Sequence, residues 1–350
     1  MKLEIIEISN SERWDEVVKS MQYYDVYYLS GYLKAFEING DGIPLLLYFK
    51  GEDTRAINIV MKRDISDCTF FHNKIEKNTF FDFSTVYGYG GFIIEGNDVE
   101  AVRKLYEEYC KTHNIICEFV RFHPLLQNWI NCDKIYETIH LGTTVCIDTS
   151  SEKNIWENIS SKNRGKIRKA IKSGLKTYWG RFPEIIDEFI EIYSETMTRD
   201  NADEYYYFDI EFYKSILNDL KDNAMWFYTK IDDEIASIAI FLYENGKMHY
   251  HLSASREKFK SFAPSNLMIY EAAMWACKNG YSELHLGGAI GSGEDSLYKF
   301  KKSFYRGEDK EFWIGKRIFN NELYEKMLNI RKNEENFNSE SSYFPQYRTK

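Results

Sequence analysis

The sequence lacks several features that would place it quickly in a class of protein. It has no apolar run of about 18 residues, so no segment is expected to cross a membrane. Its six cysteines are scattered without a CxxC pair, which favours reduced, mostly buried thiols over disulfides. The first residues, MKLEIIEISN, carry acids and no apolar stretch, unlike a signal peptide. We expect a cytoplasmic protein, and peripheral contact with the inner face of a membrane stays open.

Basic residues are also fewer than acidic ones. The chain has 45 Lys and Arg against 54 Asp and Glu, a net charge of -9, so no DNA partner is expected. Its hydrophobic content of 44% and aromatic content of 17% are ample for folded cores. A length of 350 residues suits two domains better than one.

Two phosphate-binding motifs are absent from the glycine-rich stretch HLGGAIGSGEDSLYKFKKSF, residues 285–304. Its glycines have the wrong spacing for G-x-G-x-x-G: Gly287, Gly288, Gly291 and Gly293. A Walker A loop needs a lysine after the last glycine, whereas Glu294 and Asp295 follow here. Two carboxylates would repel a phosphate, so no nucleoside triphosphate site is expected. No Ser–His–Asp triad or catalytic carboxylate pair is recognisable either.

The order of predicted elements occurs twice along the chain. The first half offers a strand (KLEIIEI), a hairpin (PLLLYFK and TRAINIVMKR), a helix over about 98–113 and a strand (IICEFVRF). The second half offers a helix (SEKNIWENISSKNRGKIRKAIKSG), a strand (LKTYWG), a helix over about 183–197, a three-stranded meander, a helix over 264–278 and a strand (YSELHLGG). This order predicts an α+β protein with mixed sheets, divided into domains 1–150 and 151–319. The segment 320–350 is expected to pack back on the first domain.

Four stretches, taken in order, resemble the Fem-type (FemABX) peptidoglycan bridge aminoacyltransferases. CEFVRFHPLLQN is similar to their R-F-(D/x)-P turn, and SSKNRGKIRKAIKSGLKTYWG to their S-K-x-R-x-x-I-x-x-A-x-x-x-G-(V/L) segment. YSETMTRD is similar to T-x-x-R, and LGGAIGSGEDSLYKFK to L-G-G…D-S-L-Y-x-F-K. With a weaker match, YYLSGYLKAF, they extend from about Tyr27 to Lys326. The resemblance implies two tandem GNAT-like (acyl-CoA N-acyltransferase) domains with a cleft between them, and acyl transfer onto an amine.

The resemblance also implies roles for individual residues. Lys301 of the F-K pair would lie at the reacting ester and stabilise the oxyanion and the leaving group, with Phe300 beside it. Arg199 of the T-x-x-R motif would contact a phosphate or a peptide carboxylate, because a guanidinium binds such groups in a bidentate manner. A salt bridge from Arg199 to Asp200 or Asp203 explains the same residue equally well.

Two departures from the family pattern concern the acceptor and the base. His123 stands where the family has an aspartate, and a histidine titrates near neutrality, which suits a general base. A turn histidine that caps the following helix is the alternative. Where some members place a lysine for a nucleotide diphosphate, this chain has Phe36, with Lys34 two residues earlier. This disfavours a UDP-linked acceptor. Lys34 and Arg121 are kept as candidate substrate-binding residues.

A basic segment stands out in an otherwise acidic chain. From Lys162 to Lys176 there are seven basic residues and no acid. At helical spacing Arg164, Arg168 and Lys172 share one face, whereas Ile167 and Ile171 lie on another. This face suits an aminoacyl-tRNA, a CoA phosphate or an anionic lipid carrier. A solvated amphipathic helix is the alternative.

The segment REKFKSFAPSN, residues 256–266, bears on the donor. GNAT enzymes usually have an R/Q-x-x-G-x-G/A turn at the equivalent place, and this segment has no glycine. Phosphate would then be bound by side chains: Arg256, Lys258 and Lys260. The change favours aminoacyl-tRNA over acyl-CoA as the co-substrate, and no permanently bound cofactor is expected. His249 and His251 alternate on one strand without a third ligand, so no metal site is expected, and Tyr250 between them is a candidate cleft residue.

The function expected from these observations is N-acyl transfer. An aminoacyl or acyl group would move to an amine of a cell-wall peptide precursor or related glycan, by direct attack without a covalent enzyme intermediate. Two alternatives stay open. One is an acetyl-CoA-dependent N-acetyltransferase acting on an amino sugar. The other is a non-catalytic module that binds a glycan or RNA on the same fold.

Overall fold

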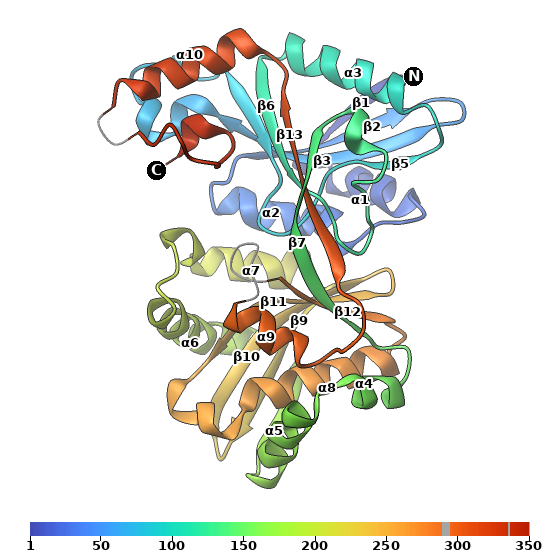
Figure 1. The fold of residues 1–350 in the computed structure, drawn as a ribbon, viewed down its shortest axis with the longest axis vertical. Helices are drawn as coiled ribbons and strands as arrows, with labels where there is room; N and C mark the ends of the chain where they lie inside the picture. Colours follow the sequence, from blue (N-terminus) through green and yellow to red (C-terminus); the bar gives the residue numbers. More distant parts are fainter. Residues whose placement is uncertain (289–294, 335–336, 350) are drawn as a thin grey trace. The chain divides into compact units, whose positions relative to one another are not determined.

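A computed structural model describes residues 1–288, 295–334 and 337–349 of the chain. The chain divides into two compact units (Figure 1). Unit 1 consists of Met1–Leu141 and Phe312–Lys350, and unit 2 of Gly142–Glu311. The first border therefore falls inside strand β7 (Glu137–Asp148), not after it near residue 150, and the second inside β13 (Lys310–Ile318).

Unit 1 is built on a mixed sheet with the strand order β1-β2-β3-β4-β6-β13. All neighbours are antiparallel except β4 and β6, and a short strand, β5, pairs with β3. Helix α3 (Val99–Thr112) makes the crossover between the parallel pair and packs on β6. The strands are β1 (Lys2–Glu7), β2 (Ile43–Lys50), β3 (Arg55–Asp64), β4 (Phe81–Ser84), β5 (Ile93–Glu95) and β6 (Ile115–Arg121).

Both faces of this sheet carry helices, because successive strand residues point to opposite sides. Ile115 of β6 belongs to the core that lies under α3, whereas the next residue, Ile116, packs with the helix α10 (Asn321–Lys332). Helices α1 (Ser11–Ser20) and α2 (Ser30–Ile38) pack on β1 and β2 respectively. The C-terminal segment from Phe312 is thus a structural part of unit 1.

Unit 2 repeats this arrangement with the strand order β7-β12-β11-β10-β9-β8. Only β11 and β12 are parallel, and helix α8 (Pro264–Lys278) forms the crossover between them. The predicted α+β class with mixed sheets in two similar units is confirmed. The strands are β8 (Lys176–Gly180), β9 (Ala224–Ile231), β10 (Glu234–Glu244), β11 (Lys247–Ser255) and β12 (Glu283–Gly287).

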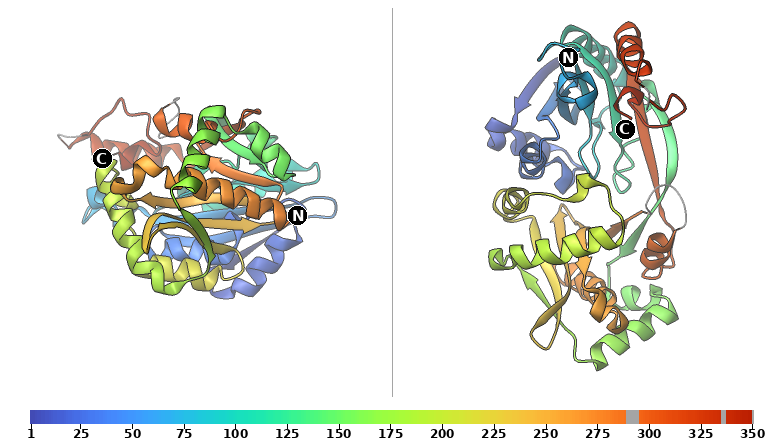
Figure 2. Two further views of the ribbon diagram at one scale, coloured as in Figure 1. Left: turned by 90° about the horizontal axis from the view of Figure 1, so that it is seen from below. Right: turned by 90° about the vertical axis from the view of Figure 1, so that its left-hand side faces the viewer.

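Helices cover both faces of the second sheet as well (Figure 2). Phe227 of β9 contacts Trp275 of α8, with ring centroids 5.9 Å apart. The preceding residue, Trp226, contacts Phe189 on the other face at 4.7 Å. That face carries α6 (Ile186–Arg199) and α7 (Ile210–Asp219), and the α8 face also carries α4 (Glu152–Asn158) and α5 (Ser161–Lys172). Among the described residues, no helix has both the length and the apolar character needed to cross a membrane.

One predicted helix is wrong in detail. The stretch predicted as a single helix from Ser151 forms two, α4 and α5, because the Ser160 hydroxyl accepts the backbone N–H of Asn163 and starts a new helix. Ile167 is buried as expected, but Ile171 is 52% exposed, so the predicted apolar face is narrower.

The cysteines are free thiols, and four of the six are buried.

Candidate active site

The most distinctive side chain of unit 2 is a buried lysine. Lys301 lies on the helix α9 (Ser296–Lys302), which begins at a cap where the Asp295 carboxylate accepts the N–H of Tyr298 at 2.7 Å. Lys301 is only 9% exposed, and its ammonium donates to the carbonyl oxygen of Gly288, 2.7 Å away. Burial lowers the pKa of Lys301 to about 8, while the Asp295 carboxylate acts in the opposite direction. Lys301 is therefore largely a cation at pH 7 in a site of low exposure, and Gly288 is the hydrogen-bond acceptor found for it among the described residues.

Strands β11 and β12 diverge close to this lysine. Their parallel pairing covers three positions and ends where His249 lies opposite His285, although β11 continues to Ser255. On its other side β12 stays paired with β7, with a bulge between His285 and Gly287. Gly287 has a φ of +77°, and a Cβ there would come within 3.3 Å of the Lys301 Nζ atom. The ammonium thus lies against the end of β12, where the parallel pairing has ceased.

A chain of buried polar side chains starts at the same place. The Nε2 atom of His285 lies 2.8 Å from the Thr144 hydroxyl, and its Nδ1 atom lies 3.4 Å from Nδ1 of His249. These three side chains are each 2% exposed or less. Thr144 lies on β7, and its methyl group would be 3.5 Å from a Cβ at Gly288, the residue whose carbonyl binds Lys301. We name this set the Thr144–His285–His249 chain.

Helix α9 is held in place by one carboxylate. Asp309 accepts hydrogen bonds from the Tyr298 hydroxyl at 2.5 Å and from the Lys302 ammonium at 2.6 Å. The hydroxyl of Thr143, next to Thr144 on β7, also points to Asp309, at 3.5 Å. Because Tyr298 and Lys302 flank Lys301 on the same short helix, Asp309 fixes the helix that presents the ammonium.

The other candidate residues of unit 2 near this region differ in their surroundings. Phe300 is partly buried and packs against Phe304, with centroids 5.4 Å apart, so it contributes to the core beside Lys301. Tyr250 packs on Phe241 at 5.4 Å, and burial raises its pKa to about 12. Arg199 ends α6 and donates to the Ser255 carbonyl at 3.1 Å. It also pairs with a carboxylate of Asp200 at 3.2 Å and with Glu257 at 3.5 Å, which is the structural alternative that the sequence allowed.

The basic residues of α5 differ in their ion-pair partners from the basic residues that follow β11. Arg164 and Arg168 stack over the Trp156 ring at 6.0 and 5.1 Å, and Lys172 is exposed. No ion pair with a carboxylate is found for these three residues in the part of the chain that the structure describes.

The candidate phosphate ligands that follow β11 in the sequence already form ion pairs with glutamates. Arg256 pairs with Glu191 at 2.8 Å and with Glu195 at 3.1 Å. Lys258 pairs with Glu234, and Lys260 with Glu257 at 3.3 Å. A phosphate at this place would have to displace carboxylates. Among the described residues, the predicted donor ligands on α5 have no carboxylate partner, whereas those that follow β11 do.

The candidate residues in unit 1 are His123, Arg121 and Lys34. His123 is fully buried, and its Nδ1 atom accepts the backbone N–H groups of Leu125 and Leu126 at 3.2 and 3.3 Å. Its Nε2 atom faces the Asp25 carboxylate at 3.4 Å. A ring whose Nδ1 lone pair is taken and whose Nε2 faces a carboxylate is a turn-capping histidine. Its role as a general base stays a prediction that this geometry does not favour.

The side chains of Arg121 and Lys34 are more exposed to solvent than that of His123. Arg121 is the last residue of β6 and is partly exposed, and its backbone N–H is bound by the Thr85 hydroxyl at 3.1 Å. Lys34 is exposed on α2, whereas Phe36 on the same helix is buried against Tyr32. Their roles toward an acceptor stay predictions. Gly291, Gly293 and Glu294 of the glycine-rich stretch lie outside the described residues.

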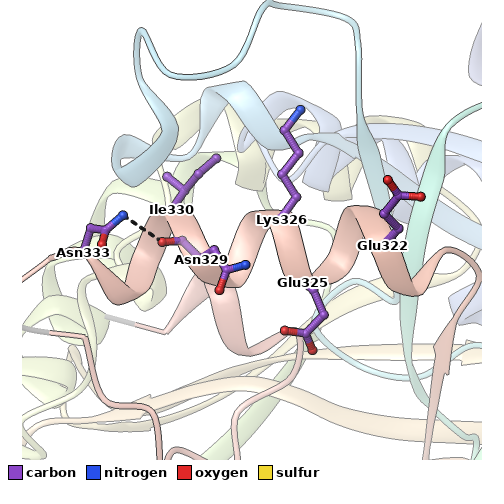
Figure 3. A pocket seen from close by; sticks show the side chains of 6 residues that line it. All are labelled: Glu322, Glu325, Lys326, Asn329, Ile330 and Asn333. Atoms are coloured by element: carbon purple, nitrogen blue, oxygen red, sulfur yellow. Dashed lines mark hydrogen bonds between the residues drawn. The ribbon is translucent and has the colours of Figure 1, made fainter.

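A surface hollow runs along α10 in unit 1 (Figure 3). One hydrogen bond joins its lining residues, from the Asn333 side-chain amide to the Asn329 backbone carbonyl at 3.1 Å. The residues are exposed or partly exposed side chains of one helix and include no buried charge, so the hollow has no features of a catalytic site. Its lining consists of Glu322, Glu325, Lys326, Asn329, Ile330 and Asn333.

Comparison with known proteins agrees with this geometry. Residues 161–302 match the family described as "Acetyltransferase (GNAT) domain". Among solved structures, FemX is similar over 93% of this chain and 99% of its own, with 16% identity and a TM-score of 0.67. No curated protein sequence matches the chain.

Two further structures share the fold over nearly their whole length. The C-terminal domain (DUF2156) of a putative lysylphosphatidylglycerol synthetase from Agrobacterium fabrum covers 93% of this chain and 96% of that chain, at 12% identity and a TM-score of 0.58. A tandem GNAT protein from the clavulanic acid biosynthesis pathway covers 91% and 99%, at 7% identity and a TM-score of 0.51.

Together these findings show a GNAT domain over residues 161–302 and a tandem GNAT fold over nearly the whole chain, as in FemX. The fold that the sequence resemblance implied is thereby confirmed. Lys301 lies at the end of the matched region, on the helix that carries the F-K pair.

Proposed function

We propose that this protein transfers an aminoacyl or acyl group from an activated ester or thioester to an amine of a cell-wall peptide precursor or related glycan. The observation that carries the proposal is the ammonium of Lys301, buried in a GNAT domain at the end of β12 and oriented by the carbonyl of Gly288. A fixed cation in a dry site stabilises a developing oxyanion far better than the same cation would in water. The choice of acceptor rests on the resemblance of the four sequence stretches to the Fem-type peptidoglycan bridge aminoacyltransferases.

The reaction fits direct attack by the amine. The amine nitrogen forms a bond to the carbonyl carbon while Lys301 N–H groups bind the carbonyl oxygen as it gains charge. The C–O or C–S bond to the donor then breaks, and the leaving atom takes a proton. A covalent intermediate on Cys146, whose Cα lies opposite that of His285, is disfavoured because burial raises the pKa of this thiol far above its usual value.

The donor is best explained as an aminoacyl-tRNA. The α5 cations lie on an exposed helix without carboxylate partners among the described residues, which suits the phosphates of an RNA backbone. Arg256, Lys258 and Lys260 are neutralised by glutamates. Among the predicted donor ligands, the α5 cations are therefore the ones best placed to attract a polyanion.

An acyl-CoA donor, as in an N-acetyltransferase acting on an amino sugar, is the second candidate. Asn163, 2% exposed, accepts a hydrogen bond from Asn266 in the first turn of α8 at 2.7 Å. The side-chain N–H₂ group of Asn163 is buried without a hydrogen-bond partner in the described part of the chain. A helix N-terminus with a spare buried donor beside it suits a CoA diphosphate. Ala263, which precedes this helix in a left-handed conformation, stands where a glycine would be more usual.

A donor test with a charge-matched control separates the two. Purified protein is assayed for transfer from acetyl-CoA and from a mixed aminoacyl-tRNA pool. A variant without three α5 cations (Lys166→Gln, Arg168→Gln, Lys172→Gln) is compared with one lacking three exposed, ion-paired lysines of unit 2 (Lys153→Gln, Lys214→Gln, Lys278→Gln).

The account predicts transfer from aminoacyl-tRNA that weakens with added salt. The α5 variant should lose affinity for tRNA and show a shallower dependence on salt, by about 0.7–0.9 in the log–log slope for each lost phosphate contact. The control variant should behave as the wild type. Transfer from acetyl-CoA alone, unaffected by the α5 changes, would favour the second candidate. Binding of either ligand without transfer from any donor would instead indicate a non-catalytic binding module.

A further inference from the structure

A net proton must leave the reacting amine, and the proposed mechanism so far gives it no path. An ammonium acceptor that becomes an amide releases one proton, after the leaving oxygen or sulfur has taken its own. In unit 1 His123 has its Nδ1 lone pair engaged by two backbone N–H groups. In unit 2 His251 is kept neutral, because burial and the neighbouring His249 lower its pKa to about 3.

We propose that the Thr144–His285–His249 chain carries this proton away from the acyl-transfer site beside Lys301, an inference that rests on the proposed function. Thr144 is taken as the end that faces the lysine, since its methyl group lies 3.5 Å from the Cβ position of Gly288, whose carbonyl binds the ammonium. His249 is the far end, on β11. In this assignment Thr144 touches the reacting amine, and the two histidines are positioning residues that act through it.

The two measured contacts define how the proton moves. With His285 protonated at Nδ1, this N–H points to Nδ1 of His249, and the bare Nε2 accepts the Thr144 hydroxyl. The amine N–H bond breaks as Thr144 takes the proton and passes its own to Nε2 of His285. The Nδ1–H bond of His285 then breaks and an N–H bond forms at Nδ1 of His249. The chain ends with one additional proton on His249, and no oxidant or other reactant is needed.

Several ionisable groups of unit 2 surround the chain. Among the described residues of that unit they include Lys301 on α9, His251 on β11 and Cys146 on β7. Two of them are neutral at pH 7, because burial lowers the pKa of His251 and raises that of Cys146. The Lys301 cation disfavours a resting imidazolium in the chain. A proton that enters at Thr144 is therefore driven toward the end farther from the lysine.

The test uses two acceptor amines that differ in whether a proton must leave before attack. Glycinamide is partly protonated at neutral pH, whereas methoxyamine is a neutral amine there. Transfer to each is measured against pH for the wild type, Thr144→Val, Thr144→Ser and His285→Gln. We expect Thr144→Val and His285→Gln to slow transfer to glycinamide by about 100-fold at pH 7 and to move the rising limb of the pH profile to higher pH. Transfer to methoxyamine should change little, and Thr144→Ser, which keeps the hydroxyl, should restore the rate with glycinamide.

Equal losses with both amines, or no loss, would overturn the relay while leaving the proposed function intact. A wild-type protein that transfers to neither amine from any donor would refute the proposed function and the relay together. A second measurement uses only the wild type, so it tests the relay even if a variant does not fold. Nitrogen NMR of histidine-labelled protein should show one protonated and one bare Nδ1 in the His249–His285 pair, and two protonated Nδ1 atoms would contradict the relay.

Discussion

The ammonium nitrogen of Lys301 lies 2.7 Å from the carbonyl oxygen of Gly288, just beyond the last residue of β12. This contact fixes the ammonium at the end of the strand. Burial lowers the pKa of Lys301 to about 8, against an opposing effect of the Asp295 carboxylate.

The pH dependence of turnover should therefore have a falling limb set by Lys301. At pH 7 most of the protein carries the charged lysine, and the charged fraction declines as the pH rises through about 8. We expect kcat for a neutral acceptor such as methoxyamine, measured at saturating donor, to fall with a midpoint near that pH. A rate that stays level to pH 10 would show that the charge on Lys301 is not needed.

Asp309 should matter for catalysis although it does not touch Lys301. Asp309→Asn removes the charge that holds Lys302 and weakens the acceptor for Tyr298, so α9 loses its anchor. We expect kcat to fall by about 10-fold or more with KM little changed, and the protein to lose about 1–3 kcal/mol of stability. Glu308→Gln, an exposed neighbour with the same change in charge, is the control and should leave both quantities unchanged. Similar effects from both variants would remove the anchoring role.

Whether a feature of the site can be predicted depends on how far apart in the sequence its interacting residues lie. Lys301 and the two-unit order can be predicted because a motif or an amphipathic pattern is local. The Thr144–His285–His249 chain cannot, since its members lie on three strands that only the tertiary fold aligns. His249 is visible as half of an alternating histidine pair, but its partner proves to be His285 on β12. The Ser160 cap that splits α4 from α5 is a local signal that the basic run obscures.

The stability of unit 1 should depend on pH through Glu118, independently of the acyl-transfer reaction. This buried carboxyl is bonded by the hydroxyls of Tyr106 and Tyr136 at 2.6 and 2.8 Å and by the Asn58 amide at 3.1 Å. Burial raises its pKa to about 7, against a weaker opposing effect of these three bonds. Its contribution to stability is complete below the unfolded pKa, near 4.5, and is lost as the pH rises through 7.

Glu118→Gln should remove this dependence. Urea unfolding at pH 5 and pH 9 should show that the wild type loses stability at the higher pH relative to the variant. Glu108→Gln, exposed on the neighbouring helix α3, should follow the wild type at both values. Parallel behaviour of wild type and Glu118→Gln across this range would mean that the carboxyl does not change its protonation between these two pH values.

The C-terminal segment should be held by a buried ion pair. Asp82 is fully buried and binds the Arg348 guanidinium and the Tyr347 hydroxyl at 2.6 and 2.8 Å. Burial would raise the pKa of Asp82, but the guanidinium groups of Arg348 and Arg63 together hold it below its usual value. Arg348→Leu should cost about 3 kcal/mol at pH 7, because it removes one of the two guanidinium groups that pair with this buried carboxylate among the described residues.

This cost should shrink in acid, since the stabilisation from a carboxyl of lowered pKa is lost as the pH falls through the folded value. Lys332→Leu, which removes an exposed cation of the same unit, serves as the comparison and should change stability by less than about 0.5 kcal/mol. An equal loss at pH 7 and at pH 3 would argue that Arg348 contributes through packing alone.

The most direct test of the account is single-turnover acyl transfer by Lys301→Met beside Lys299→Met. Both changes remove one lysine from α9, but Lys299 is exposed and Lys301 is buried. We predict that Lys301→Met is folded, melts at or above the wild-type temperature because a buried charge is gone, and transfers about 100- to 1000-fold more slowly, while Lys299→Met matches the wild type. A folded Lys301→Met protein that transfers at the wild-type rate would contradict the account.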